Sequence, residues 1–307
     1  MSDQLKKYLF QDQSARVQAV KLTKSWQTGL LHQSYPECVQ RLLGELMSAA
    51  VLLAANIKFD GSLVLQLQGD GPLALVVVEC GADLTIRATA TLREGHDIPA
   101  EGTLQSLLNM HGQGRFIVVL DPGREATHLK PYQGIVPLEG ETVAEVLELY
   151  MRNSEQLDTR LWLAANAEQS AGLLLQRLPD HGGTGETDPE AADSTWERAS
   201  ILAQTVTQDE LLALETDALI HRLFWDETLI AFEPQNIVWW CPCSRERVGN
   251  MLRMLGHDEI ESILHEHQHI DVSCNFCGKP YRFDAIDCAG LFVETFNKPQ
   301  PDAKSVH

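Results

Sequence analysis

The sequence has no long apolar run. The longest apolar stretch, residues 47–55, is far shorter than the roughly 20 residues that cross a bilayer as a helix. Polar residues follow the initiating methionine, with no apolar segment of the kind that begins an export signal. We therefore expect a soluble, cytoplasmic protein with no membrane partner.

Basic residues are also scarce. The chain has 24 lysines and arginines against 43 aspartates and glutamates, a formal net charge of −19. Affinity for nucleic acid depends mainly on basic side chains that neutralise phosphates, and no run of such residues occurs here. We expect no nucleic-acid partner. The same charge would keep the protein soluble while apolar surface is exposed.

Cysteines are few and unevenly placed. Four of the seven form two close pairs, and Cys38, Cys80 and Cys288 are scattered. Without an export signal, paired cysteines more often bind metal or perform redox chemistry than form structural disulfides. Cys38 and Cys80 lie in apolar surroundings and are expected to be inert core thiols. Cys288 is either a spare ligand or resolving thiol, or a buried and inactive one, and the second interpretation is favoured.

The length and an apolar fraction of 44% predict an α+β protein that begins with an α/β sheet domain over residues 1–179. Alternation and β-branched residues indicate strands, and apolar periodicity indicates helices. A Gly-Asp-Gly sequence at 69–71 predicts a hairpin turn, because the Lys-Ser/Thr of a phosphate-binding loop is missing. The expected strands are 63–68, 73–80, 84–92 and 115–120, and the expected helices are 38–55, 142–150 and 167–178.

Residues 180–235 differ in composition and are interpreted as a helical linker. A glycine-rich polar stretch at 181–185 indicates the domain boundary. Residues 180–233 hold thirteen acidic side chains against two basic ones, together with many large apolar residues. Capping-box patterns at Ser194 and Thr207 predict the starts of two helices. These amphipathic helices are either packed permanently on the first domain or folded only conditionally; composition favours the former.

Residues 236–295 are predicted to form a small zinc domain, followed by a tail over 296–307. Its motif is Cys241-Pro242-Cys243, thirty residues, and then Cys274-Asn275-Phe276-Cys277. Four thiolates in two close pairs satisfy one tetrahedral zinc ion per chain. Gly278 suits the turn of the second pair. Between the pairs, the pattern predicts helices over 248–255 and 259–265, separated by a glycine, and a strand over 270–272.

The zinc site has two interpretations. It is either a permanent structural site or a switch, because neighbouring thiols at these spacings can also close disulfides. Structural zinc contributes roughly 10 to 16 kcal/mol to small domains, and a whole domain is stable by about 5 to 15 kcal/mol. Loss of zinc would therefore unfold the module.

Other metal and catalytic patterns are weak. His265, Glu266 and His269 match the HExxH motif of metalloproteases, but the motif runs directly into an expected strand, and a solvated, histidine-rich helix end is favoured. A zinc deaminase is excluded because no Pro-Cys-x-x-Cys follows His257-Asp258-Glu259. No nucleophile and base arrangement stands out. We expect no enzyme, no catalytic residues and no organic cofactor.

With these motifs in place, the sequence resembles the redox-regulated 33 kDa chaperonin family, the heat-shock proteins of 33 kDa. The resemblance extends over nearly the whole chain. The blocks that carry it are Tyr35-Pro36, Leu42-Leu43-Gly44-Glu45, 65–72, 132–138, Ser154-Glu155-Gln156, 241–247, Leu255-Gly256, Glu259-Ile260 and 274–277. Departures from the family pattern are the His265, His267 and His269 cluster, Trp239-Trp240, and Cys288.

The resemblance implies an ATP-independent holdase of the bacterial cytoplasm. In the family, the reduced, zinc-bound form is inactive, and oxidants convert the four cysteines to disulfides and release zinc. By position, Cys241 would pair with Cys243 and Cys274 with Cys277. The linker and zinc domain then unfold, and the protein dimerises and holds unfolding clients, which later pass to ATP-driven foldases. The competing classes are a static zinc module that mediates binding and a thiol oxidoreductase.

Overall fold

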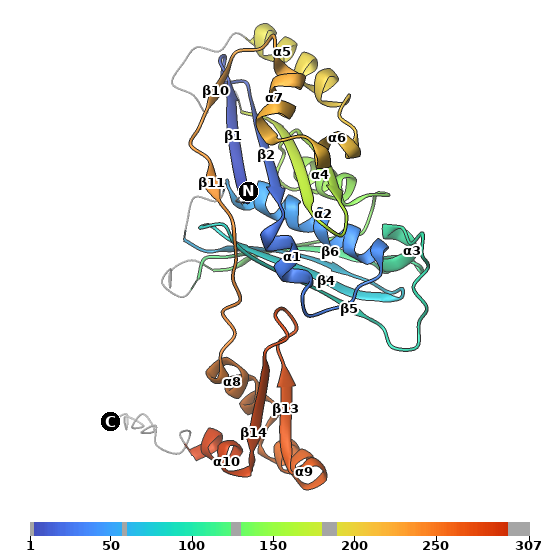
Figure 1. Cartoon of the computed structure of the whole chain (residues 1–307), viewed down its shortest axis with the longest axis vertical. Coiled ribbons are helices and arrows are strands. Elements are labelled where there is room, and N and C mark those ends of the chain that lie inside the picture. Colours follow the sequence, from blue (N-terminus) through green and yellow to red (C-terminus); the bar gives the residue numbers. More distant parts are fainter. Residues whose placement is uncertain (1–2, 57–59, 124–129, 180–188, 294–307) are drawn as a thin grey trace, which may run out of the picture. The chain divides into compact units, whose positions relative to one another are not determined.

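The computed structural model describes residues 3–56, 60–123, 130–179 and 189–293 (Figure 1). The glycine-rich stretch at 181–185, expected to be the domain boundary, and the tail at 296–307 lie outside these ranges. The chain separates into two compact units, one ending at Trp240 and one beginning at Cys241. Helices and sheets are mixed in both units, so the predicted α+β class is confirmed.

The first unit contains two six-stranded sheets. In the first sheet the order is β10-β1-β2-β9-β8, with β11 also paired to β1, and the neighbouring strands run antiparallel. Its strands are β1 (Gln4–Phe10), β2 (Ala15–Leu22), β8 (Thr159–Ala165), β9 (Ser170–Arg177), β10 (Leu229–Ala231) and β11 (Gln235–Asn236).

The second sheet has the order β12-β5-β4-β3-β6-β7, in which only the pairing of β12 with β5 is parallel. The strand predicted from alternation and the three predicted from β-branched residues are confirmed here, and the Gly-Asp-Gly sequence at 69–71 connects β3 to β4 as a hairpin turn. The strands are β3 (Ser62–Gln68), β4 (Leu73–Gly81), β5 (Thr85–Leu92), β6 (Arg115–Asp121), β7 (Tyr132–Pro137) and β12 (Val238–Trp239).

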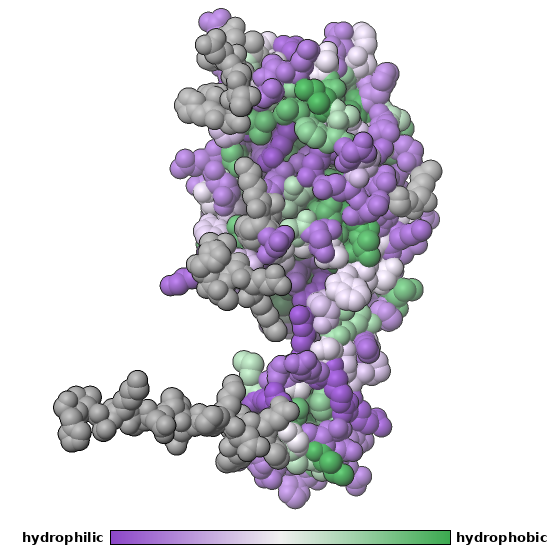
Figure 2. Space-filling view, turned by 90° about the vertical axis from the view of Figure 1, so that its left-hand side faces the viewer, coloured by the Kyte–Doolittle hydropathy of each residue, from purple (hydrophilic) through white to green (hydrophobic). Residues whose placement is uncertain are grey.

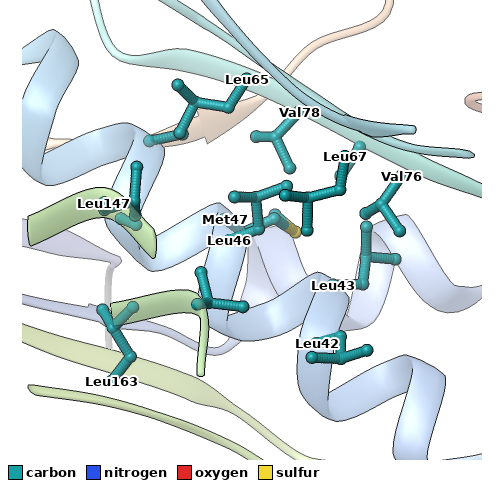
Figure 3. Packing of buried hydrophobic residues seen from close by; sticks show 14 of the residues in the cluster. Leu42, Leu43, Leu46, Met47, Leu65, Leu67, Val76, Val78, Leu147 and Leu163 are labelled. Atoms are coloured by element: carbon teal, nitrogen blue, oxygen red, sulfur yellow. The ribbon is translucent and has the colours of Figure 1, made fainter. Parts of the chain in front are cut away.

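The long helix α2 (Glu37–Ala54) lies between the two sheets and contacts strands of both (Figure 1). Leu46 and Met47 of this helix pack with Leu65 and Val78 of the second sheet in the main core (Figure 3). The predicted helices at 38–55 and 142–150 are confirmed as α2 and α4 (Val143–Asn153), and the Thr142 side chain caps α4. Two short helices, α1 (Lys24–Leu30) and α3 (Leu104–Leu108), complete the first domain.

The helix predicted over 167–178 is wrong, because this segment forms strand β9. All residues from Ser170 to Gln176 are buried, since β9 is an inner strand covered on both faces. Leu174 packs into the core around α2, whereas Leu173 and Leu175 pack on the opposite face of the sheet. A strand buried on both faces has a continuous apolar sequence that periodicity does not distinguish from a helix.

The outer face of the first sheet is covered by the predicted linker, which forms α5 (Pro189–Ala203), α6 (Gln208–Ala213) and α7 (Thr216–Phe224). The capping box at Thr207 is confirmed at the start of α6. The helix start predicted at Ser194 is wrong, because α5 already begins at Pro189. Proline suits the first helical turn, where its missing N–H group has no intrahelical partner in any case.

The second unit is a small αβ module. It contains α8 (Arg245–Leu255), α9 (His257–His267), the antiparallel pair β13 (His269–Ser273) and β14 (Pro280–Asp284), and α10 (Ala285–Val293). The two predicted helices, the strand and the break at Gly256, with φ +93°, are confirmed. Its buried core consists of Leu252, Ile260, Ile270, Tyr281, Phe283 and Cys288.

Candidate metal centre

The four paired cysteines converge in the second unit. Cys241 and Cys243 lie in the segment before α8, and Cys274 and Cys277 lie in the turn between β13 and β14. The four Sγ atoms all lie within 4.8 Å of one another. Residues separated by thirty positions in the sequence are thus brought into one cluster by the local fold of this module.

Each pair is positioned by backbone hydrogen bonds. The N–H of Gly278 donates to the carbonyl of Cys274 at 2.8 Å, and the N–H of Cys274 donates to the carbonyl of Lys279 at 3.0 Å. Gly278 has φ +67°, a left-handed conformation that glycine adopts without steric cost. On the other side, Ser244 follows Cys243 directly and caps α8 by accepting from the N–H of Arg247. The turn and the cap fix both thiol pairs.

The spacing of the thiols fits a tetrahedral ion. The Sγ atoms of Cys241 and Cys274 are 3.6 Å apart, and those of Cys243 and Cys277 are 3.4 Å apart. Zinc–sulfur bonds of about 2.3 Å in a tetrahedron place the sulfurs about 3.8 Å from one another. All four cysteines are free thiols in this structure, because a disulfide needs sulfurs about 2.05 Å apart. The donor set and its spacing fit a zinc ion.

The thiols have different electrostatic surroundings. Burial raises the pKa of Cys241, and it raises the pKa of Cys277 to about 12. Burial acts in the same direction on Cys243, but hydrogen bonds from Tyr281 and from the neighbouring thiols outweigh it and lower the pKa of Cys243 to about 7. The Tyr281 hydroxyl donates to the Cys243 Sγ at 3.1 Å. The surroundings of Cys243 therefore favour its thiolate, whereas those of Cys241 and Cys277 favour the neutral thiol.

Tyr281 is a site residue that sequence reasoning missed. It pairs with Val272 across the β13–β14 ladder, which brings its side chain next to the cysteine turn. Its neighbour Phe283, two positions along the strand, is buried in the module core and stacks under the Arg245 guanidinium at 4.2 Å. The alternation of large residues at 281 and 283 was the available signal, but it indicates only a strand face.

The remaining cysteines and histidines lie apart from this cluster. Cys38 and Cys80 are buried in the core around α2, as predicted, and burial raises the pKa of Cys80 well above its usual range. Cys288 is buried among the residues of the module core. The HExxH residues do not share one helix, because α9 ends at His267 and His269 begins β13. Within the described ranges, no second group of three or more ligating side chains is close enough to share an ion.

Comparison with known proteins places the chain in a family. A family model described as Hsp33 protein matches residues 3–284. The 33 kDa chaperonin of Methylobacillus flagellatus is 45% identical and aligns over 99% of each chain. The 33 kDa chaperonin of Chromobacterium violaceum is 43% identical over 94% of each chain. Both relatives match almost end to end.

The fold has a counterpart among solved structures. The crystal structure of the 33 kDa chaperonin (heat shock protein 33 homologue) of Thermotoga maritima superposes with a TM-score of 0.77 over 96% of this chain and 99% of that one, at 20% identity. No helix among the residues described here is long and apolar enough to cross a membrane. The two sheets, the covering helices and the four-cysteine module thus occur together in a chain that matches a family model over most of its length, and the protein belongs to the Hsp33 family.

Proposed function

We propose that the protein is a redox-regulated, ATP-independent holdase of the cytoplasm, inactive when reduced and zinc-bound. The observation that carries this proposal is the cluster of four free thiols in a module with a very small core. A core in a unit of this size rarely supplies more than about 3 to 5 kcal/mol, so a bound metal would decide whether the module folds. A device that removes the metal would then act as a conformational switch.

Oxidation is the proposed trigger. Two thiolates and one molecule of hypochlorous acid give a disulfide, chloride and hydroxide, so four thiolates consume two molecules of oxidant. Disulfide sulfurs are far poorer ligands than thiolates, and the Zn²⁺ ion leaves without changing its oxidation state. We propose that Cys241 pairs with Cys243 and Cys274 with Cys277. In the reduced cluster, Cys241 lies close to Cys274 and Cys243 lies close to Cys277. Mapping the disulfides of the oxidised protein by mass spectrometry tests the proposed pairing, and bonds between the two pairs would contradict it.

The surface proposed to hold clients is the outer face of the first sheet. In the reduced form this face is buried under α5, α6 and α7, where Phe10 packs edge-on against Phe224 at 5.6 Å. If these helices detach, the face becomes exposed and can bind unfolded chains. Its apolar residues are Tyr8, Phe10, Ala15, Val17, Ala19, Ala164, Ala171, Leu173 and Leu175. On the face drawn in Figure 2, hydrophobic residues form separate areas among hydrophilic ones, as suits a resting state.

The ion pairs that join these helices to the first sheet each have an exposed carboxylate, and Lys21 and Gln169 also donate to backbone carbonyls of the covering segment. Asp217 of α7 accepts from Lys6 at 2.7 Å and from the Tyr8 hydroxyl at 2.9 Å, and the Asp217 side chain is 72% exposed. Exposed ion pairs contribute about 0 to 1 kcal/mol each. Docking would therefore depend mainly on apolar burial, which also drives client binding, so the helices and a client would compete for one surface.

The remaining features of the proposal follow from the same exposed surface. Two activated chains would dimerise and hold unfolded clients, and ATP-driven foldases would receive these clients afterwards. The net charge of −19 would limit precipitation of the open form. We propose no catalysed reaction and no nucleic-acid or membrane partner for this protein.

The test is light scattering of a heat-unfolding client without ATP. The zinc-loaded, reduced protein should suppress aggregation poorly, the oxidised protein should suppress it well, and thiol reductant with zinc should restore the first state. Hydrogen exchange across residues 195–232 should rise on oxidation and fall on reduction. Equal suppression by both forms would refute the redox switch, and unchanged exchange would refute the role of the helices.

A further inference from the structure

A second polar site lies in the first unit, in a cavity of about 400 Å³. It is formed where β1, β2 and the C-terminal end of α2 meet the residues that follow β9 and β10. The lining residues are Lys7, Tyr8, Leu9, Arg16, Gln18, Ala55, Asn56, Leu178 and Phe232. This lining has two basic side chains and no carboxylate, in a chain whose acidic residues outnumber its basic ones by 43 to 24.

The strand register directs both cations to one cavity. Lys7 pairs with Gln18 and Leu9 pairs with Arg16 across the β1–β2 ladder, so Lys7 and Arg16 are diagonal neighbours on the same face. Diagonal neighbours in a ladder lie about 7 to 8 Å apart, within reach of long side chains. A single anionic group placed between them can therefore contact both.

Among the described residues, the hydrogen-bond partners of both cations are neutral. The Lys7 Nζ donates to the carbonyl of Ala55 at 2.7 Å, and the Arg16 Nε donates to the Gln176 Oε1 at 3.0 Å. Neither side chain forms an ion pair with a carboxylate in the part of the chain that the structure describes. The Arg16 guanidinium has five N–H donors, of which the contacts with Gln176 use those on Nε and one Nη. Donors remain for a ligand.

The surroundings of Lys7 and Arg16 disfavour the charged forms of both side chains. Burial lowers the pKa of Arg16, and burial followed by repulsion from Arg16 lowers the pKa of Lys7. Two like charges in a partly buried site disfavour each other, and an anion would stabilise both. One role of Lys7 is already visible, since it satisfies a carbonyl near the C-terminal end of α2. That role does not account for the nearby Arg16.

The rest of the cavity is apolar or neutral. Leu178 and Phe232 contribute hydrophobic surface, and Gln18 and Asn56 bond to each other at 2.8 Å. Sites for small organic ligands typically combine such apolar walls with a few convergent polar groups. The volume of this cavity is also in the range of such sites.

We propose that this cavity binds a small organic anion. Its carboxylate or phosphate group lies between Lys7 and Arg16, and its apolar body lies against Leu178 and Phe232. Both anionic groups accept paired N–H donors from a guanidinium, so the chemistry of recognition is shared. The site is independent of the four-cysteine cluster.

The test is isothermal titration calorimetry of the full, zinc-loaded, reduced chain. Phenyl phosphate and 3-phenylpropionate are the probes, with inorganic phosphate for comparison. At least one of the two aromatic probes should bind, with a stoichiometry of one molecule per chain. Its affinity should fall at high salt, because salt screens the attraction between the anion and the two cations. A preference for phenyl phosphate would identify a phosphorylated ligand, and the reverse preference a carboxylate. Absence of binding by both probes at millimolar concentrations would overturn the proposal.

Substitutions locate the binding. Arg16→Gln and Lys7→Met should each weaken the preferred probe about tenfold, the loss of one charge-assisted contact. Phe232→Ala should weaken that probe but not inorganic phosphate. Arg93→Gln is the matched control, because Arg93 also donates only to neutral acceptors, the carbonyls of Gly69 and Gly71, and lines no part of this cavity.

Thermal unfolding of each variant checks that it is folded. If Arg16→Gln does not fold, Lys7→Met provides the test, because methionine keeps most of the aliphatic part of the lysine side chain. Unchanged affinity in a folded Lys7→Met protein, or an equal loss in Arg93→Gln, would refute the site.

Discussion

Glu45 is a buried carboxylic acid in the middle of α2, and its charge should oppose folding at neutral pH. Only 8% of its surface is exposed, and it faces a cavity walled by α4, β8 and α6. Burial raises the pKa of Glu45 from 4.5 to about 7, with Arg41 acting in the opposite direction. Each pKa unit corresponds to about 1.36 kcal/mol, so the difference between folded and unfolded chains amounts to about 3 kcal/mol.

The sign follows from proton binding. Between about pH 4.5 and 7 the folded state holds the proton and the unfolded state does not, so stability from this group falls as pH rises. The stability that protonated Glu45 contributes is fully present below about pH 4.5 and is lost above about pH 7. Glu45→Gln keeps the shape without the charge. Relative to the parent, it should gain up to about 3 kcal/mol of unfolding free energy at about pH 8.5 and far less at about pH 5.

Urea denaturation followed by tryptophan fluorescence measures this difference, because Trp26 is fully buried in the same core as α2. The Glu37→Gln substitution, at an exposed position on the same helix, is the control for the loss of a surface charge. A stability difference between Glu45→Gln and the parent that is equal at both pH values would refute the reasoning, since it would mean that Glu45 titrates as in the unfolded chain.

Three further predictions concern the metal centre and the covering helices. Cys274→Ser should reduce zinc content well below one ion per chain by atomic absorption, whereas the core substitution Cys80→Ala should leave it unchanged. The double variant His265→Ala with Glu266→Ala should keep the parent's zinc content and client protection, because α9 ends before the HExxH pattern is complete; peptidase activity lost in that variant would contradict this. Asp217→Asn should increase hydrogen exchange across α7, because it weakens two hydrogen bonds to β1 worth about 1 kcal/mol each; unchanged exchange would show that apolar packing alone holds this helix.

The clustering of the four cysteines was predictable because each half of the cluster is local. Two cysteines two or three positions apart lie in the same turn, and only one long-range meeting of the two turns had to be assumed. Tyr281 was not predictable, because its contact with Cys243 depends on the register of β13 against β14. The sequence alone does not specify that register.

The fold was predictable where a segment has one buried face. The alternation in β3 and the amphipathic pattern of α4 predict these elements correctly, whereas the apolar sequence of β9, which is covered on both faces, predicts a helix. The strand β12 is two residues long and pairs with β5 across a great sequence distance, so no local pattern marks it. Tertiary packing, rather than local preference, decides these segments.

The segment between α7 and Cys241 also covers an edge strand of each sheet. β10 and β11 pair with β1, and β12 pairs with β5, so this segment satisfies backbone N–H and C=O groups on two outer strands. Were it to detach, those groups would become open edges, which attract any extended polypeptide through main-chain hydrogen bonds. Such pairing does not depend on the sequence of the partner. It would add main-chain hydrogen bonds, which have a defined direction, to the apolar contacts of the exposed sheet face.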